Sequence, residues 1–248
     1  MRDLVYPPVI GFAKTALKVL DVKFQLTGTE NVPRTGGAVI AMNHISYVDF
    51  VLGGFGALPS KRLVRFMAKE ALFRNRYSGP LMRGMHHIPV DRAAGTASYR
   101  QALRYLNEGE IVGVFPEATI SRSFELKEFK SGTVRMAAAA AVPLIPMILW
   151  GTQRMLTKDH PRDFSRHRTI AITVGEPITV ARGDNPVEAT EHLHSTMAGM
   201  LDRTIRAYPE QPAGAWWLPA SYGGSAPTPE EAERLDREEL ARRAARKK

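Results

Sequence analysis

A histidine and an aspartate five positions apart, His44 and Asp49, are the residues best placed to do chemistry in this chain. An imidazole oriented by a carboxylate is a common general base, which removes the proton from a hydroxyl group. On a regular helix a five-residue offset sets two side chains about 140° apart. The pair therefore requires a strand that ends at Met42 and a turn at His44. It predicts activation of an alcohol, and a solvent-exposed turn is the alternative.

A second polar segment, 85–92, combines two histidines with an Asp-Arg pair. Arg92 follows a short apolar run, where its guanidinium can bind a phosphate or pair with Asp91 at the surface. His86 and His87 are adjacent, and adjacent side chains of a strand point to opposite faces of a sheet. We therefore expect no metal site there.

A third segment, 114–122, runs from an apolar strand into carboxylate, hydroxyl and guanidinium groups. The ends of strands and the loops that follow them hold the ligands of α/β folds. Glu117 can accept a hydrogen bond from an acceptor hydroxyl, and Arg122 can meet a phosphate with Thr119 and Ser121 beside it. The G-x-S-x-G pattern of serine hydrolases is absent, and the chain has no cysteine.

A fourth segment, 141–147, places two prolines three positions apart among apolar residues. Val142, Pro143 and Pro146 would form a stiff apolar wall. Such a wall can line an acyl channel, and it can equally be ordinary core.

The 248 residues carry 34 basic and 25 acidic side chains, a formal net charge of +9. This excess predicts an anionic partner, namely nucleic acid, an anionic membrane surface or a phosphorylated substrate, unless it is only a solvated basic surface. No helix-turn-helix, zinc or RNP-type signature supports nucleic acid. Basic residues interleaved with apolar ones over 61–83 favour an anionic headgroup surface or a phosphate funnel instead.

The N-terminal segment 9–20 has apolar residues at helical spacing, with Lys14 and Lys18 on one face. It is either a helix packed on the core or a membrane-surface helix. No secretory signal is visible, and no stretch approaches the roughly 18 to 20 apolar residues of a spanning helix. We therefore expect a protein that does not cross a membrane, which leaves open that it lies on one.

The pattern along the rest of the chain predicts an α/β fold, a mixed central sheet flanked by helices. Strands are predicted at 22–28, 38–42, 64–68, 87–90, 111–115, 144–150 and 169–174. Helices are predicted at 47–58, 96–107, 133–141 and 185–208, with helix and loop mixed over 71–84. Three regions follow: a membrane-associating helix at 1–21, a catalytic domain at 22–208, and a C-terminal region at 209–248. That last region is an extended Gly- and Pro-rich segment, followed by a charged tail that is either helical or disordered.

With these four segments in this order, residues 22–180 resemble the 1-acylglycerol-3-phosphate (lysophosphatidate) acyltransferases. The N-H-x4-D motif of that family is matched by Asn43, His44 and Asp49. The other matches are Ile88, Asp91 and Arg92; Pro116 to Ser121; Val142, Pro143 and Pro146; Lys69 to Phe73; and Phe129 to Gly132.

The third motif departs from the usual Pro-Glu-Gly-Thr-Arg-Ser of the family. Ala118 stands at its glycine, and Ile120 at its arginine. If that arginine helps to hold the acceptor phosphate, Arg122 is the obvious substitute, with Arg92 and Lys69 in support.

The resemblance implies acyl transfer from acyl-CoA or acyl-carrier protein to the hydroxyl of a lysophospholipid, lysophosphatidate foremost. His44 would be the base and Asp49 its orienting group, with no covalent acyl-enzyme, metal or cofactor. The partners would be the anionic lysolipid, the donor and the inner face of the cell membrane, reached from the cytoplasm, with no nucleic acid. The alternatives are transfer to another lipid hydroxyl, such as that of a glycolipid sugar, and a non-catalytic anionic-lipid-binding protein.

Overall fold

The computed structural model describes residues 3–91 and 95–245, and the strands found there form one mixed sheet. The strand order is β1-β7-β6-β2-β5-β3-β4. Strands β6, β2, β5, β3 and β4 are parallel, while β7 is antiparallel to β6 and parallel to β1. Their bounds are β1 Lys23–Thr27, β2 Ala38–Met42, β3 Val64–Lys69, β4 Ile88–Val90, β5 Ile111–Val114, β6 Leu144–Trp150 and β7 Thr169–Val174. The predicted α/β class with a mixed central sheet is confirmed.

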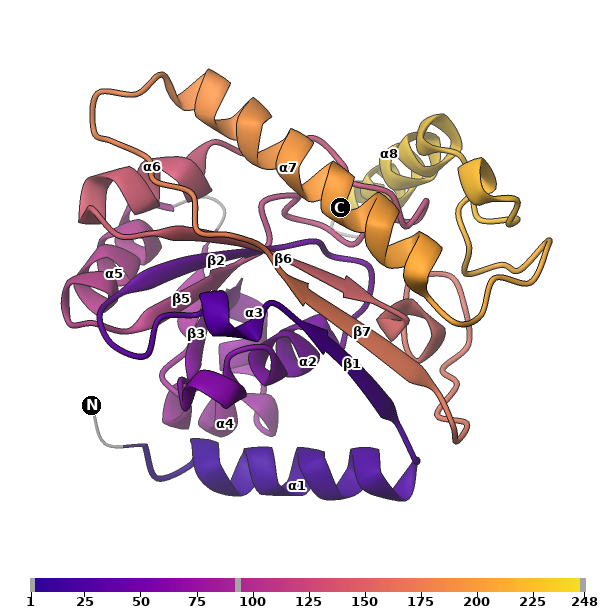
Figure 1. The fold of residues 1–248 in the computed structure, drawn as a ribbon, viewed down its shortest axis with the longest axis horizontal. Helices are drawn as coiled ribbons and strands as arrows, with labels where there is room; N and C mark the ends of the chain where they lie inside the picture. The colour runs from indigo at the N-terminus through magenta and orange to yellow at the C-terminus, as the bar shows by residue number, and fades with distance from the viewer. Residues whose placement is uncertain (1–2, 92–94, 246–248) are drawn as a thin grey trace.

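Helices cover both faces of this sheet (Figure 1), because side chains of successive strand residues point to opposite sides. Along β2, Val39 and Ala41 pack with α5, α6 and α7, whereas Ile40 and Met42 pack with α1 and α2. Every residue of β2 is buried, as a central strand covered on both faces requires. The helices are α1 Tyr6–Val19, α2 Asp49–Phe55, α3 Glu70–Arg74, α4 Ser78–Gly84, α5 Gly95–Asn107, α6 Gly132–Ala140, α7 Pro186–Ala207 and α8 Pro229–Ala245.

Helix α2 is shorter than the predicted 47–58. It begins at Asp49 and ends at Phe55, because glycines at 53, 54 and 56 weaken a helix. They also let it lie very close to the sheet, since a Cβ at Gly53 would sit 2.5 Å from the sulfur of Met42.

The histidine pair precedes strand β4 and does not lie in it, contrary to the strand predicted at 87–90. Strand β4 begins at Ile88, and the positive φ of 57° at His86 turns the backbone there. His87 is buried beneath Tyr6 and Phe66, and it accepts a hydrogen bond from the Phe66 N–H at Nδ1 (3.1 Å). Burial and the nearby Arg65 lower the pKa of His87 to about 4, so this imidazole is a neutral core side chain.

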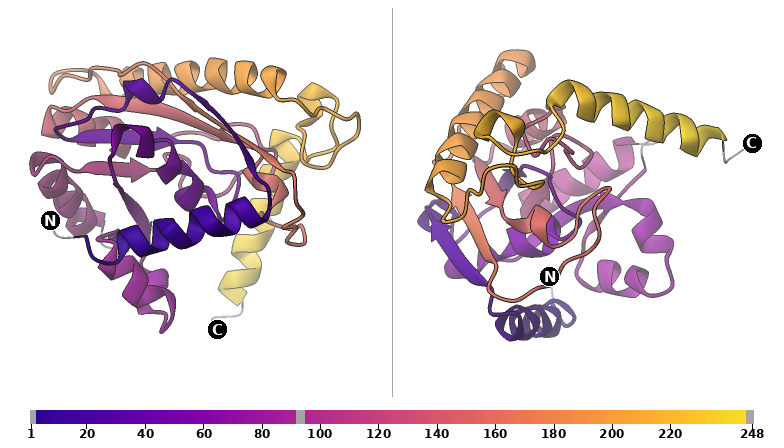
Figure 2. Two further views of the ribbon diagram at one scale, coloured as in Figure 1. Left: turned by 60° about the horizontal axis from the view of Figure 1, so that its bottom comes forward. Right: turned by 90° about the vertical axis from the view of Figure 1, so that its right-hand side faces the viewer.

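Helix α1 packs on the sheet, the first of its two predicted alternatives, and it also exposes large apolar side chains, so the membrane-surface role stays a prediction. Tyr6 and Leu17 are buried, and the Tyr6 hydroxyl donates to the Val64 carbonyl (2.8 Å). Phe12 and Val19 are 77% and 66% exposed. The helix lies along one side of the body (Figure 2). Within residues 3–91 and 95–245, no helix has the length and apolar character needed to traverse a bilayer.

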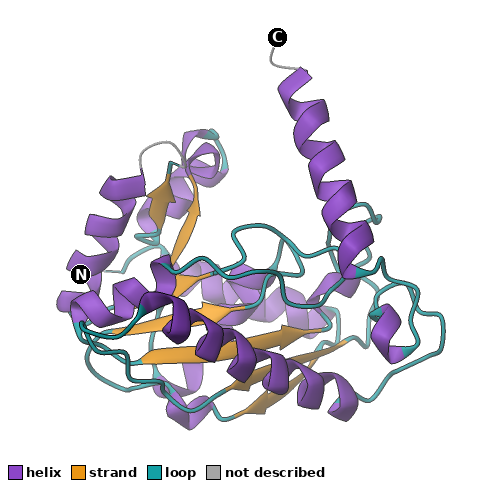
Figure 3. Cartoon of the chain, turned by 90° about the horizontal axis from the view of Figure 1, so that it is seen from above, coloured by secondary structure: helices purple, strands orange, loops and turns teal. Residues whose placement is uncertain are grey.

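Beyond α7, the chain crosses the surface without strands and then forms α8. Trp217, Leu218 and Ala226 of this stretch join the core cluster of α5, α6 and α7. The charged tail is helical through residue 245, the first of the two predicted alternatives. Helix α8 projects away from the body towards its free end (Figure 3).

Candidate active site

His44 and Asp49 come together at the turn between β2 and α2. Strand β2 ends at Met42 and α2 begins at Asp49, so the intervening residues are free of helical geometry. The His44 Nδ1 lies 3.0 Å from Asp49 Oδ2. Because a carboxylate accepts hydrogen bonds, Nδ1 carries the proton and Nε2 is the basic nitrogen of this pair.

The Asp49 carboxylate is fully buried and held by three further donors. The backbone N–H groups of Ile45 and Ser46 each donate to Oδ2 at 2.7 Å, and the Thr152 hydroxyl donates to Oδ1 at 2.6 Å. Four donors to its two oxygens hold the carboxylate in one orientation. The carboxylate in turn fixes the orientation of the imidazole.

The imidazole itself stays accessible. Its side chain is 20% exposed and stacks on the Phe115 ring at 4.2 Å and 24°. Asn43, just before it, donates from Nδ2 to the Leu149 carbonyl (3.0 Å) and accepts from the Leu149 N–H at Oδ1 (2.7 Å). Asn43 therefore ties the end of β2 to β6, and His44 is presented from a rigid strand end.

Glu117 follows β5 and braces the same turn. Its Oε1 accepts from the His44 N–H (2.8 Å) and its Oε2 from the Lys127 N–H (3.2 Å). Burial raises the pKa of Glu117 to about 8, although these two N–H donors and the Lys127 ammonium pull it down. Both carboxyl oxygens face backbone groups, so the structure gives Glu117 a positioning contact with His44.

The rest of the third motif is a tight loop against the His44 turn. The Ser121 N–H donates to the His44 carbonyl (2.7 Å), and its buried hydroxyl donates to the Glu125 carbonyl (2.7 Å). Thr119 accepts at Oγ1 from the Lys127 Nζ (2.9 Å). Ile120, at the position of the family arginine, is only 4% exposed. The side chains of Ile120 and Ser121 are therefore both buried in the protein interior.

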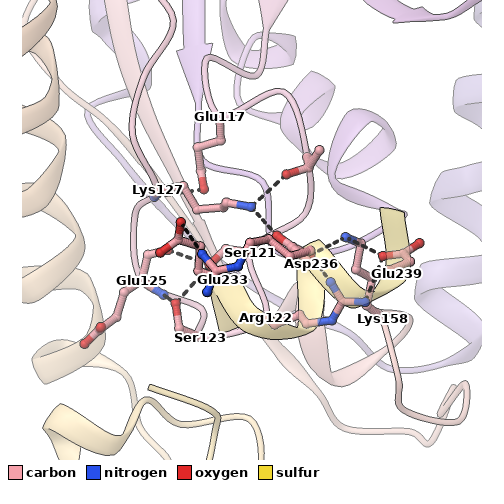
Figure 4. Close-up of polar contacts among 12 residues, drawn as sticks. Glu117, Ser121, Arg122, Ser123, Glu125, Lys127, Lys158, Glu233, Asp236 and Glu239 are labelled. Carbon is pink, nitrogen blue, oxygen red and sulfur yellow. Dashed lines mark hydrogen bonds and ion pairs between the residues drawn. The ribbon is translucent and has the colours of Figure 1, made fainter. Parts of the chain in front are cut away.

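Arg122 lies among three carboxylates, two of them on α8 (Figure 4). Its guanidinium pairs with Asp159 of a surface loop and with Asp236 and Glu239 of α8. Lys127 also pairs with Asp236, and Lys158 pairs with both α8 carboxylates (3.1 and 3.3 Å). We call Arg122, Lys127 and Lys158 the cation cluster.

Of the remaining phosphate-binding candidates, Lys69 lies along the same edge of the sheet. The parallel strands β2, β5, β3 and β4 all end there, and Lys69 is the exposed last residue of β3, paired in register with Val90. Arg92 follows β4 and lies outside the described residues, so its phosphate contact stays a prediction.

The apolar-wall candidates lie elsewhere. Strand β6 is parallel to β2, with Leu144 opposite Val39, so Val142 and Pro143 stand at the end of the sheet away from His44. Pro146 is buried within β6, opposite Ala41. The structure does not bring this set to the His44 turn.

Four site residues escaped the sequence reasoning: Phe115, Lys127, Thr152 and Lys158. Lys127 lies two positions before the Phe129–Gly132 segment, which was the signal available for it. Thr152 follows the last residue of β6 by two positions, a strand end at the same edge as His44. Lys158 gave no signal, because a lone lysine in a polar loop is ordinary surface.

An α/β sheet that holds a buried carboxylate and an accessible imidazole at its strand-end edge has the arrangement expected of a general-base site. Within residues 3–91 and 95–245, no three His, Asp or Glu side chains gather as a metal site would require.

Comparison with known proteins identifies the family. The chain belongs to the Acyltransferase family, whose family model matches residues 23–150. It is an enzyme similar to the 1-acyl-sn-glycerol-3-phosphate acyltransferases. It is 33% identical to that of Bacillus subtilis (strain 168) over 171 residues, which cover 67% of this chain and 81% of the relative. It is 28% identical to that of Borreliella burgdorferi over 150 residues, 59% of this chain and 58% of the relative.

The fold is also that of a solved structure. The crystal structure of the 1-acyl-sn-glycerophosphate (LPA) acyltransferase PlsC from Thermotoga maritima superposes with a TM-score of 0.69. The match covers 82% of this chain and 80% of that one at 21% identity. At this identity the likeness extends to the fold, the mixed sheet flanked by helices.

Proposed function

We propose that this protein transfers a fatty acyl group from acyl-CoA or acyl-carrier protein to the free hydroxyl of lysophosphatidate, giving phosphatidate. The observation that carries the proposal is the His44–Asp49 pair, with its 3.0 Å contact and its buried, four-donor carboxylate. The relatives that bear this activity in their names supply the substrate class.

The reaction is a direct transfer. His44 Nε2 takes the proton of the acceptor hydroxyl as its oxygen attacks the thioester carbonyl, while Asp49 stabilises the imidazolium. The tetrahedral intermediate then expels the thiolate, which receives the proton from the imidazolium. No acyl-enzyme forms, since the chain has no cysteine and the Ser121 hydroxyl is hydrogen-bonded to the backbone.

The acceptor phosphate would meet cations along the strand-end edge. Arg122 stands one residue after Ser121, whose N–H contacts the His44 carbonyl, and Lys69 ends β3 at the same edge. Arg92 is the third candidate. A guanidinium binds phosphate oxygens in pairs, so we assign the principal contact to Arg122.

The acyl chain would enter an apolar cavity between α1 and α2. Its lining includes Val9, Ile10, Ala13, Phe50, Val51 and Phe55. Aromatic contacts run from this lining to the base: Phe50 to Phe66 at 6.3 Å, Phe66 to Phe115 at 6.2 Å, and Phe115 to His44 at 4.2 Å. This continuity favours the cavity over the apolar-wall set of Val142, Pro143 and Pro146.

An acceptor panel tests the proposal. Purified protein is offered acyl-CoA with lysophosphatidate, lysophosphatidylcholine or a glycolipid, and product is measured with His44→Ala as the blank. Lysophosphatidate is expected to react at least about tenfold faster than the glycolipid, since a charge-assisted contact to phosphate contributes about 1.5–3 kcal/mol, and lysophosphatidylcholine shows whether a phosphodiester suffices. Faster transfer to the glycolipid would contradict lysophosphatidate as the acceptor and favour a glycolipid hydroxyl instead.

Transfer to another lipid hydroxyl is the second candidate, and one observation favours it. The family arginine is replaced by the buried Ile120, and the substitute Arg122 is paired with carboxylates in this structure. A glycolipid sugar needs no phosphate site. The same panel separates the two acceptors.

We also propose that α1 and the α3–α4 hairpin lie on the membrane, from the cytoplasmic side. Their exposed apolar side chains are Leu4, Phe12, Val19, Leu72, Tyr77 and Leu81, interspersed with Lys14, Lys18 and Arg74. Helices α1 and α4 lie at the lower side of the molecule in Figure 1, and an apolar cluster of Tyr6, Phe73, Met82 and Met85 joins α1 to the α3–α4 hairpin. Apolar anchors beside basic residues suit an anionic lipid surface.

Vesicle flotation checks this placement. Protein is expected to float with vesicles that contain phosphatidylglycerol, and Phe12→Ser is expected to reduce the bound fraction several-fold because it removes an anchor that does not support the core. Leu240→Ser, which removes a 61% exposed apolar side chain from α8, is the matched control. Equal flotation of the two variants would contradict the role of α1.

A further inference from the structure

Helix α8 sets two carboxylates on the cation cluster beside the candidate base. Asp236 contacts all three cations, and Glu239 contacts Arg122 (2.8 Å) and Lys158 (3.3 Å). The face that α8 turns to the body carries Ala232, Leu235, Asp236 and Glu239, at the spacing of one helix face. Figure 4 shows both carboxylates directed into the cluster.

The charges at the cluster balance only when α8 is docked. Arg122, Lys127 and Lys158 carry three positive charges, and Asp159, Asp236 and Glu239 carry three negative ones; Arg243, which pairs with Glu239, and Glu233, near Lys127, both come from α8 and add one charge of each sign. Without the two α8 carboxylates the cluster has a net charge of +2. A phosphomonoester carries about −1.5 to −2 at pH 7, so it would replace them almost charge for charge.

The apolar anchoring of α8 is slight. Of its 17 residues one, Ala232, is buried, and Leu240 is 61% exposed. Its docking therefore depends on ion pairs, which another anion can displace. The pairs themselves are partly desolvated, since the Arg122 side chain is 5% exposed and that of Asp236 is 16% exposed.

The cluster adjoins the catalytic turn through two hydrogen-bonded links. The Lys127 N–H donates to Glu117, whose other oxygen holds the His44 N–H. Arg122 follows Ser121, whose N–H donates to the His44 carbonyl. An anion on the cluster would therefore lie beside the base.

We propose that the cation cluster is a phosphomonoester site that α8 fills from within, with Asp236 and Glu239 standing where the phosphate oxygens bind. Helix α8 leaves the cluster when the ligand arrives. We take the natural ligand to be the acceptor lipid, and this rests on the function proposed above. A free phosphomonoester tests the site independently of that function.

Hydrogen exchange on the full chain measures the displacement. Saturating glycerol 3-phosphate is expected to speed exchange of the α8 amides several-fold, while glycerol at equal ionic strength is expected to leave them unchanged. The amides of residues 43–49 serve as an internal reference. If α8 amides exchange at the same rate with and without glycerol 3-phosphate, the proposal is overturned.

Neighbouring glutamates on α8 supply a matched pair of variants. Glu239 faces the cluster, and Glu238, 48% exposed, pairs instead with Arg234. Glu239→Gln is expected to lower the Kd for glycerol 3-phosphate about tenfold, since one competing charged contact is removed, and Glu238→Gln is expected to leave it unchanged. A lower melting temperature for Glu239→Gln with an unchanged Kd would make α8 purely structural and overturn the proposal.

The two proposals fail separately. Exchange and Kd for glycerol 3-phosphate need no acyl transfer, so a protein that moves α8 but does not acylate lysophosphatidate contradicts only the proposed function. Acylation of lysophosphatidate with α8 amides unmoved contradicts only the displacement of α8.

Discussion

The His44–Asp49 turn and the cation cluster are adjacent, yet they are held in opposite ways. The turn is fixed by short side chains and backbone N–H groups between neighbouring strands, with the Asp49 carboxylate wholly buried. The cluster is held by long side chains that reach α8, 78 to 117 residues away in the chain. The comparison teaches that the chemistry is rigidly positioned while the recognition of the anion is adjustable.

The largest effect should come from removing the base itself. His44→Ala is expected to lower the transfer rate about 10²–10⁴-fold with an unchanged melting temperature, because general-base catalysis contributes that much. Steady-state transfer to lysophosphatidate measures it. His192→Ala, an exposed histidine on α7, is the control. A folded His44→Ala protein with full activity would show that the rigid His44–Asp49 turn does not carry the chemistry.

The buried Glu117 carboxyl, which holds the His44 N–H, should make the free energy of unfolding depend on pH. Its carboxyl has a pKa of about 8 when folded and about 4.5 when unfolded, so the folded state binds the extra proton between these values. The free energy of unfolding should therefore fall as pH rises from 5 to 8, by up to about 1.4 kcal/mol per pH unit. Urea unfolding of the wild type and Glu117→Gln compares the slopes.

The contribution of Glu117 is isolated by a surface control. Glu128→Gln changes an exposed carboxyl immediately before the Phe129–Gly132 segment and should keep the wild-type slope. Glu117→Gln should flatten it, because the amide takes up no proton. Parallel slopes for all three proteins would mean that the Glu117 carboxyl is ionised over the whole range from pH 5 to 8.

The hydroxyl of Thr152 should matter for rate more than for binding. Thr152→Val keeps the shape and removes the 2.6 Å donor to Asp49, so kcat is expected to fall about tenfold with KM unchanged. Thr152→Ser, which restores the donor, should recover most of the rate. A Val variant with normal kcat and pH profile would show that the other three donors suffice.

Salt should separate the two regions most simply. At 1 M ionic strength the screening length shrinks to about 3 Å, which weakens the partly buried ion pairs of α8 more than the hydrogen bonds of the fully buried Asp49 carboxylate. Amides of α8 are expected to exchange several-fold faster at 1 M than at 0.1 M sodium chloride, whereas those of residues 43–49 should not. Equal acceleration in both regions would mean that the whole edge loosens together.

The fold was readable where strands are buried on both faces. Strands β2, β6 and β7 have the predicted bounds, since uninterrupted apolar runs of five to seven residues leave little choice. The ends of α2 and β4 could not be predicted in this way. The backbone conformation at the glycines 53, 54 and 56 and the left-handed turn at His86 depend on tertiary contacts.

The same division runs through the site. The His44–Asp49 contact follows from the strand end at Met42, which local pattern reveals. The positions of Thr152 and Lys158 follow from the pairing of β2 with β6 and the path of the next loop, which no local pattern encodes. Nor could the ion pairs of Arg122 be predicted, since their partners lie in a tail whose helicity was itself open.

Ala118 bears on which sequences this loop can tolerate. Its φ of 60° is a left-handed conformation that costs an alanine about 1–2 kcal/mol and a β-branched residue more. Position 118 is thus limited by backbone shape, while Ile120 two residues on is limited by burial. A library that randomises both positions should return mainly Gly, Ala and Asn at 118 and apolar residues at 120, whichever acceptor is used for selection.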